Sequence, residues 1–296
     1  MQQAETKVSF EKEFSHLNLH DSTRHALQRL YSYAPSPEEH AVLDRLHQYP
    51  SQKTAAVLVL LYEHNEILRV LLTTRSKALR SHPGQTAFPG GKCDPQDANV
   101  KETALREAHE ECGLDPKSPA LHYIGQLPPY LSQWKLVVTP VLFFLDDPSV
   151  LASLVPCTQE VDRIFTHPLQ AILDPELASD EVLSRKGSDD WPYEEELYNT
   201  SDSTWTQIRG SLYRMHRFRS AASPIKGLTS DVLIRVAQIA YEAEPTYQRY
   251  GPGQPTHTQF VAWALEDLSS DTTTRIEVNG TMESTAYASR EVDGAQ

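Results

Sequence analysis

The chain has 296 residues, of which 39% are hydrophobic, and its formal net charge is −13. This acidic balance excludes long contacts with nucleic acid, which need a basic surface, and no apolar run approaches the ~20 residues of a membrane span. Three cysteines without metal-ligand spacing, Cys93, Cys112 and Cys157, and a polar N-terminus that resembles neither a secretory signal nor a transit peptide predict an intracellular protein.

The N-terminal part of the chain predicts helices followed by two strands. Ser36-Pro37-Glu38-Glu39 is typical of a helix start, with an early proline and acidic residues in the first turn. Residues 55–61 form a continuous apolar run, the pattern of a buried strand, and residues 67–73 predict a second strand after a short turn. We therefore expect a helical extension over residues 1–50 in front of the main domain.

The middle of the chain alternates between predicted strands and helices. A Gly- and Pro-containing loop over residues 75–92 holds one expected short strand at 86–88, and a helix is predicted from about 99 to 112. Residues 121–127 and 136–145 predict further strands. The acidic, irregular stretch 175–196 predicts an inserted loop.

The C-terminal part predicts a hairpin, a helix and a tail. Residues 205–209 and 212–218 alternate enough for a hairpin, and Thr229-Ser230-Asp231 predicts the cap of a helix to about residue 243. A short helix is expected over 260–268, and the Ser-, Thr-, Asp- and Glu-rich residues beyond it predict disorder. We divide the chain into a main domain over 51–247 and a mostly disordered tail over 248–296.

The predicted helix over 99–112 carries three glutamates near its end. Glu107 and Glu111 are four residues apart and share a face, and Glu110 is three residues from Glu107. Like charges at this spacing cost roughly 0.2–0.5 kcal/mol per pair, whereas a divalent cation bound by their oxygens turns repulsion into attraction. By itself an acidic helix face is more often a solvated surface.

The context of these glutamates favours a site. Gly90-Gly91-Lys92 precedes the helix, and residues 106–114 read Arg-Glu-Ala-His-Glu-Glu-Cys-Gly-Leu. This pattern resembles the Nudix box, a glycine and an acidic position followed by Arg-Glu, apolar, any, Glu-Glu, any, Gly, apolar. The acidic position is occupied by Asp97, and eight residues instead of seven separate it from Arg106. The role of Asp97 is therefore open, and capping of the helix is one alternative.

A second motif lies directly upstream. Residues 71–76 read Leu-Leu-Thr-Thr-Arg-Ser, residues 79–85 read Leu-Arg-Ser-His-Pro-Gly-Gln, and residues 88–91 read Phe-Pro-Gly-Gly. Together they resemble the signature of the coenzyme A diphosphatase branch of Nudix hydrolases, and the similarity extends over about residues 55–241. The resemblance implies the α/β Nudix fold, a mixed β-sheet sandwiched between α-helices.

The resemblance also implies roles for the box residues. Glu107, Glu111 and the carbonyl of Gly91 would bind Mg²⁺ or Mn²⁺, the cofactor of the family. Glu110 would be a third ligand or the group that positions water, and Arg106 would orient a carboxylate. The general base is open between Glu110 and the loop residue Glu160.

The substrate implied by the resemblance is coenzyme A or an acyl-CoA, split at its diphosphate into adenosine 3′,5′-bisphosphate and (acyl) 4′-phosphopantetheine. Residues 67–93 contain no Asp or Glu, and such a basic segment next to a metal helix suits a small polyanion. Arg75, Arg80, Gln85 and Lys92 are its candidate substrate-binding residues.

Two alternatives stay open at this point. The chain would act on ADP-ribose or another nucleoside diphosphate derivative, or it would be a non-catalytic Nudix-fold binding module. A binding module is expected to have lost box glutamates, and all three are present here. The family has peroxisomal and mitochondrial members, but the sequence shows neither signal, so a cytoplasmic or an organellar location is expected. Protein partners are not predicted.

Overall fold

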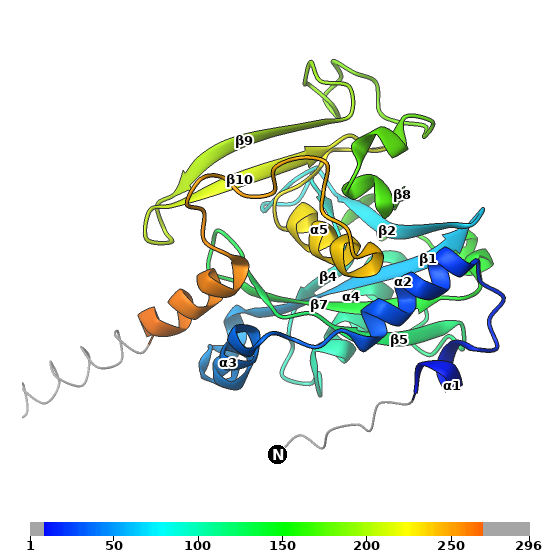
Figure 1. The fold of residues 1–296 in the computed structure, drawn as a ribbon, viewed down its shortest axis with the longest axis horizontal. Coiled ribbons are helices and arrows are strands. Elements are labelled where there is room, and N and C mark those ends of the chain that lie inside the picture. Colours follow the sequence, from blue (N-terminus) through cyan, green and yellow to red (C-terminus); the bar gives the residue numbers. More distant parts are fainter. Residues whose placement is uncertain (1–8, 269–296) are drawn as a thin grey trace, which may run out of the picture.

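A computed structural model describes residues 9–268, which form a mixed β-sheet covered by helices on both faces (Figure 1). The α-helices are α1 (Phe10–Phe14), α2 (Asp21–Ser32), α3 (Pro37–Arg45), α4 (Val100–Cys112) and α5 (Leu228–Tyr241), and residues 257–268 are also helical. The strands are β1 (Thr54–His64), β2 (Ile67–Arg75), β3 (Thr86–Ala87), β4 (Gly90–Lys92), β5 (Leu121–Gln126), β6 (Tyr130–Leu131), β7 (Val137–Leu145), β8 (Val161–Pro168), β9 (Tyr198–Trp205), β10 (Ser211–Phe218) and β11 (Ile225–Lys226).

The main sheet has eight strands, and its central path runs β3-β2-β1-β7-β5. β1 pairs in parallel with β7 and antiparallel with β2 and β4, while β6 pairs with β7 and β8 with β2. This makes β1 a central strand buried on both faces, which is why its sequence is a continuous apolar run. A separate three-stranded sheet has the order β11-β10-β9.

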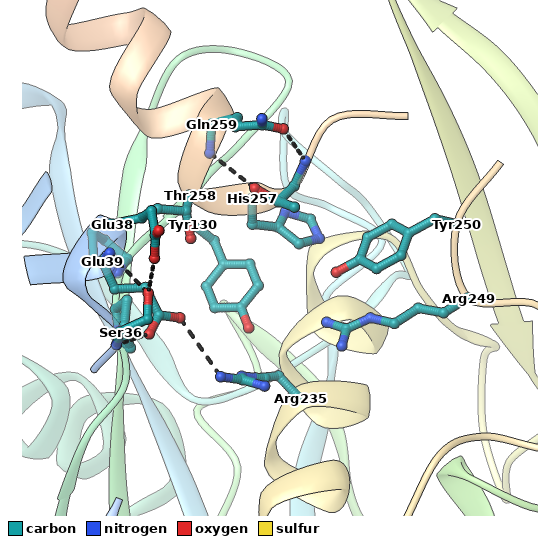
Figure 2. A pocket seen from close by; sticks show the side chains of 13 residues that line it. Ser36, Glu38, Glu39, Tyr130, Arg235, Arg249, Tyr250, His257, Thr258 and Gln259 are labelled. Atoms are coloured by element: carbon teal, nitrogen blue, oxygen red, sulfur yellow. Dashed lines mark hydrogen bonds and ion pairs between the residues drawn. The ribbon is translucent and has the colours of Figure 1, made fainter. Parts of the chain in front are cut away.

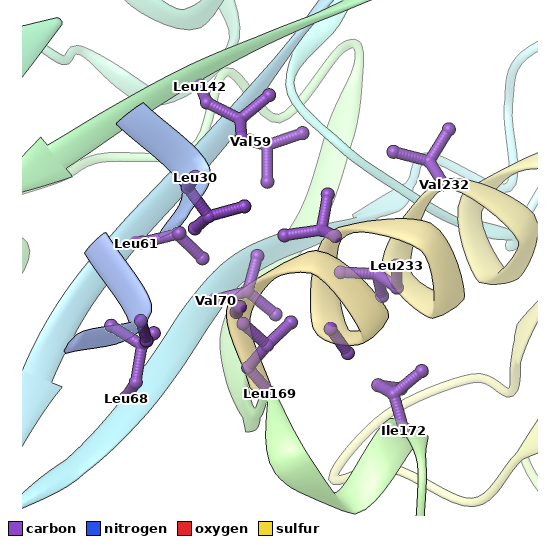
Figure 3. Close-up of a cluster of buried hydrophobic side chains, with 14 of the residues drawn as sticks. Leu30, Val59, Leu61, Leu68, Val70, Leu142, Leu169, Ile172, Val232 and Leu233 are labelled. Carbon is purple, nitrogen blue, oxygen red and sulfur yellow. The ribbon is translucent and has the colours of Figure 1, made fainter. Parts of the chain in front are cut away.

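Two hydrophobic clusters occupy the two faces of the main sheet. Successive residues of a strand point to opposite faces, so Val59 and Leu61 of β1 lie in the cluster under α2 and α5, while Leu58 and Leu60 lie in the cluster under α4. Figure 3 shows the first cluster, in which Val232 and other residues of α5 face the strands. The expected α/β architecture, a mixed sheet between helices, is confirmed.

Two local expectations were wrong. The hairpin consists of β9 and β10, and residues 206–210 form its turn, so of the expected first strand over 205–209 only Trp205 lies in a strand, as the last residue of β9. Trp205 and Ile208 are buried side chains of one hydrophobic cluster. The helix α5 begins at Leu228 after Gly227 and has no side-chain cap. Asp231, expected within the cap, is buried and accepts a 2.6 Å hydrogen bond from the hydroxyl of Tyr213. In both cases the pattern of polar residues in the local sequence did not predict which side chains are buried by tertiary packing.

The segments at both ends of the described chain pack on this core. Phe10 and Phe14 of α1 are buried, and α2 packs against α5. In the helix over 257–268, Phe260 and Val261 are fully buried in the cluster that also contains Trp205. The predicted disordered tail beyond residue 268 lies outside the described residues, so the division into 1–50, 51–247 and 248–296 stays a prediction. No helix among residues 9–268 combines the length and apolar character that crossing a membrane requires.

Candidate active site

The glycine pair of β4 forms one wall of the candidate site. β4 pairs with β1, and at Gly90 an added Cβ would lie 2.5 Å from the carbonyl oxygen of Ala56. At Gly91 an added Cβ would lie 2.4 Å from the carboxylate of Glu107. Both distances are far below ordinary contact. At Gly90 the obstacle is fixed backbone and φ is +154°, so this position requires glycine, whereas at Gly91 a side chain would displace the Glu107 carboxylate from the strand backbone.

The helix α4 forms the opposite wall. Asn99 caps its start by accepting the N–H of Glu102, and Gly113, at φ 72°, ends it in the left-handed conformation. Ala104 and Ala108 are buried against the sheet. This packing fixes the rotation of the helix and brings its glutamate face to β4.

Glu111 is the most buried acid of the site. Its side chain is only 5% exposed. One carboxylate oxygen accepts the backbone N–H of Gly90 at 3.1 Å, and the other lies 3.8 Å from the guanidinium of Arg75. The buried Nε of Arg75 has no hydrogen-bond partner among the described residues.

The site has a deficit of positive charge. Burial raises the pKa of Glu111 to about 7, and Glu107 and Glu160 raise it further, while the Gly90 N–H and Arg75 act in the opposite direction. Burial also raises the pKa of Glu107 in spite of its hydrogen bond from Arg106. The raised pKa values mean that the negative charges of the two carboxylates are poorly compensated in the metal-free protein. A hard divalent cation would supply the compensating positive charge, and the carboxylate oxygens beside the glycine backbone are ligands of the kind it prefers.

Arg106 is held by Asp97 and in turn holds the box glutamates. Its Nε and Nη2 each donate to the Asp97 carboxylate at 2.9 Å, and its Nη1 donates to Glu107 at 3.0 Å and Glu110 at 3.2 Å. These hydrogen bonds lower the pKa of Asp97 to about 2. The longer box thus keeps an acidic partner for the arginine, and Asn99 instead of Asp97 caps the helix.

The two candidate bases differ in position. The side chain of Glu110 is 53% exposed and contacts Arg106. Glu160 is exposed in the turn before β8, and its charge raises the pKa of both Glu107 and Glu111. Its carbonyl accepts the N–H of Ser76 at 2.8 Å, which ties this turn to the basic segment.

The basic segment over residues 67–93 does not act as one surface. Arg75 at the end of β2 faces the box, whereas Arg69 makes a bidentate ion pair with Glu181 at 2.7 Å and is largely buried away from it. Arg80 and Lys92 are exposed, and no ion pair of theirs is seen within residues 9–268. The structure therefore brings one of the four predicted substrate-binding residues, Arg75, against the box glutamates.

Gln85, the remaining candidate, lines a cavity of about 300 Å³. Lys77 and Lys226 also line this cavity, and so do Asp189 and Asp190 from the inserted stretch. The basic segment contains no Asp or Glu of its own, but in the folded chain it shares this cavity with Asp189 and Asp190. The order of residues along the chain does not show this proximity.

A larger cavity of about 390 Å³ lies between α3, α5 and the segment 249–259. Figure 2 shows the hydroxyl of Tyr130 and the side chains of Arg235 and Arg249 pointing toward the same space. Arg235 lies 3.7 Å from Glu39, and the ring of Tyr250 lies 4.9 Å from the guanidinium of Arg249. Sequence analysis missed these residues because they belong to no motif. Arg235 stands between the apolar residues of α5, and a charged residue in that position is a sequence signal for a polar cavity.

This cavity and the glycine strand lie at the same end of the main sheet. Tyr130 of β6 pairs with Val138 of β7, which pairs with Ala55 of β1, which pairs with Lys92 of β4. Three strand spacings of about 4.8 Å separate Tyr130 from Lys92 along this row. Tyr130 packs on the face of the sheet that α5 covers, opposite the face that α4 covers.

Comparison with known proteins identifies the domain. Residues 52–186 match the NUDIX domain family. The chain is 35% identical over 196 residues to Nudix hydrolase 15, mitochondrial, of Arabidopsis thaliana, covering 66% of this chain and 61% of the relative. It is 31% identical over 204 residues to the peroxisomal coenzyme A diphosphatase NUDT7 of Mus musculus, covering 67% and 75%. It is 44% identical over 123 residues to the mitochondrial coenzyme A diphosphatase NUDT8 of Homo sapiens, covering 40% and 50%. The chain thus spans less than two thirds of the Arabidopsis and human relatives.

Proposed function

Because the chain belongs to the Nudix family, we propose that it hydrolyses the diphosphate of coenzyme A or an acyl-CoA. The products are adenosine 3′,5′-bisphosphate and (acyl) 4′-phosphopantetheine. Relatives named as coenzyme A diphosphatases support the substrate class. The observation that carries the proposal is the carboxylate pair of the buried Glu111 and the partly buried Glu107, held against Gly90 and Gly91 with Arg75 alongside.

Glu107, Glu111 and the carbonyl of Gly91 would hold Mg²⁺ or Mn²⁺. When bound, the cation supplies positive charge at the phosphoryl oxygens and orients a water molecule for in-line attack. Arg106 keeps the Glu107 carboxylate in place through the 3.0 Å hydrogen bond, and Asp97 fixes the arginine.

The chain's own cations complete the site. Arg75 offers positive charge to the diphosphate, since its only carboxylate contact within residues 9–268 is the long one to Glu111. Arg80, Gln85 and Lys92 are the proposed further contacts to substrate. Relatives are named as mitochondrial and peroxisomal, and the organelle of this chain stays a prediction.

The test is a substrate panel of coenzyme A, acetyl-CoA, dephospho-CoA and ADP-ribose with Mg²⁺ or Mn²⁺, with products identified by mass spectrometry. We expect coenzyme A or its acyl form to have the highest kcat/KM. A preference for ADP-ribose would refute the coenzyme A assignment, and binding without hydrolysis would indicate a non-catalytic module. Glu111→Gln is the inactive control. Glu102→Gln is its matched control, because Glu102 lies on the same helix and a glutamine keeps an acceptor for the N–H of Ala98.

The general base is distinguished by pH profiles. Glu110→Gln and Glu160→Gln are compared in the dependence of kcat on pH. The variant that lacks the base loses rate and also loses the acidic limb of the profile, whereas a residue that only tunes its neighbours shifts the limb.

The 3′-phosphate of coenzyme A requires a second cationic contact. We compare two candidates for this contact, the exposed Arg80 and the cavity residue Arg249. Arg80→Ala and Arg249→Ala are assayed on coenzyme A and dephospho-CoA side by side. The variant in which the kcat/KM values for coenzyme A and dephospho-CoA become more similar identifies the contact to the 3′-phosphate. An equal loss of kcat/KM on both substrates assigns that residue to another part of the substrate.

A further inference from the structure

A cluster of two histidines and two acids lies apart from the candidate active site. His122 of β5 contacts the ring of Phe14, which belongs to the cluster under α2 and α5, on the face of the sheet opposite α4. His16 follows α1, and Asp146 follows β7. Each of His16, His122 and Asp146 offers one ligand atom, and these atoms all lie within 4.8 Å of one another.

His122 is a buried imidazole between two carboxylates. Its Nδ1 lies 3.1 Å from Glu13, and its Nε2 lies 2.9 Å from Asp146. A neutral imidazole has one N–H, so it satisfies one of these two acceptors and leaves the other facing a lone pair. The arrangement is complete only when a cation, either a second proton or a metal ion, lies on the other side.

His16 distinguishes these two cations. It is exposed, no hydrogen bond or ion pair of its side chain is seen within residues 9–268, and its ring centroid lies 5.8 Å from that of His122. A protonated His122 paired with two carboxylates makes no use of it. A metal ion does, because His16 supplies a third ligand beside His122 and Asp146.

We propose that His16, His122 and Asp146 bind a transition metal, with Zn²⁺ as the best fit. Two imidazoles and one carboxylate suit Zn²⁺ better than Mg²⁺ or Ca²⁺, which prefer oxygen ligands alone. Glu13 accepts the Nδ1–H of His122, the outer contact that sets the tautomer of metal-binding histidines. The ion joins the N-terminal segment to the edge of the sheet at β5 and β7, so its role is to hold α1 on the core.

The site is tested by metal binding in the Glu107→Gln/Glu111→Gln variant, with excess Mg²⁺ present so that the box does not contribute. We expect one equivalent of Zn²⁺ by calorimetry, visible absorption of tetrahedral character when Co²⁺ replaces it, and a rise in Tm on adding Zn²⁺. His16→Ala should lower the Zn²⁺ affinity by about tenfold or more, the scale of even an outer-contact loss. It should also abolish the rise in Tm.

His25→Ala is the matched control, because His25 is an exposed histidine of the neighbouring helix α2. It should leave Zn²⁺ binding unchanged. Absence of Zn²⁺ binding, or equal binding by His16→Ala and the parent protein, would overturn the proposal and leave His122 as a hydrogen-bond partner of its two acids. These results are independent of the diphosphatase activity, which is assayed separately on the chain with an intact box.

Discussion

Replacing Glu111 by Gln should stabilise the metal-free protein while removing its activity. The carboxylate is almost fully buried, and its pKa is raised to about 7 mainly by that burial. Glutamine keeps an oxygen for the N–H of Gly90 and removes the charge. A ligand that is costly in the metal-free fold is the expected signature of a cation site.

The magnitude follows from the pKa. A carboxyl with a folded pKa above its unfolded value contributes stability that is fully present below about pH 4.5 and is lost as the pH rises through about 7. The shift in pKa between the unfolded and the folded state destabilises the wild type by about 3 kcal/mol at about pH 8 and by under about 1 kcal/mol at about pH 5. The free energy of unfolding of Glu111→Gln should therefore exceed that of the wild type by an amount that grows from the value at about pH 5 to the value at about pH 8.

The assay is urea unfolding in EDTA at both pH values, repeated with Mg²⁺. We expect Mg²⁺ to stabilise the wild type and to have little effect on Glu111→Gln. Glu102→Gln, an exposed acid on the same helix, should stay within about 0.5 kcal/mol of the wild type at both pH values. A pH-independent difference would refute the burial argument, and equal stabilisation of both proteins by Mg²⁺ would refute the ligand assignment.

Four further outcomes are expected. Glu107→Gln should lose most coenzyme A hydrolysis in steady-state assays while its circular dichroism stays native, and near wild-type turnover would contradict its role. Asp97→Asn should release Arg106 and lower kcat by about tenfold or more, and its stability deficit should disappear as the pH falls through about 2, where the native carboxyl is neutral too. Arg75→Ala or Arg80→Ala should lower kcat/KM for coenzyme A by about ten- to a hundredfold, equal to charge-assisted contacts of ~1.5–3 kcal/mol. Truncation before Ser269 should leave kcat/KM unchanged, and a loss beyond about tenfold would show that the tail contributes to the fold or the site.

Local patterns were sufficient for the elements that build the site. The continuous apolar run of β1, the helix that ends at Gly113 and the glycine pair at residues 90–91 depend on interactions within a few residues or on burial that affects a whole segment. Motif spacing then placed Glu107 and Glu111 on one face, which the structure directs toward the glycines. Their assignment as metal ligands stays a prediction.

The partners of the charged side chains were decided by the tertiary structure. Sequence did not distinguish Arg69, which pairs with Glu181, from Arg75, which faces the box, because each partner is contributed by a distant segment. Asp97 became the anchor of Arg106 because the loop before α4 folds back on the helix. His16 and His122 are far apart in sequence and meet only where α1 packs on β5. Periodicity predicts which face of an element is buried, but it does not contain the contacts between distant elements, and these set the charge balance of both proposed cation sites.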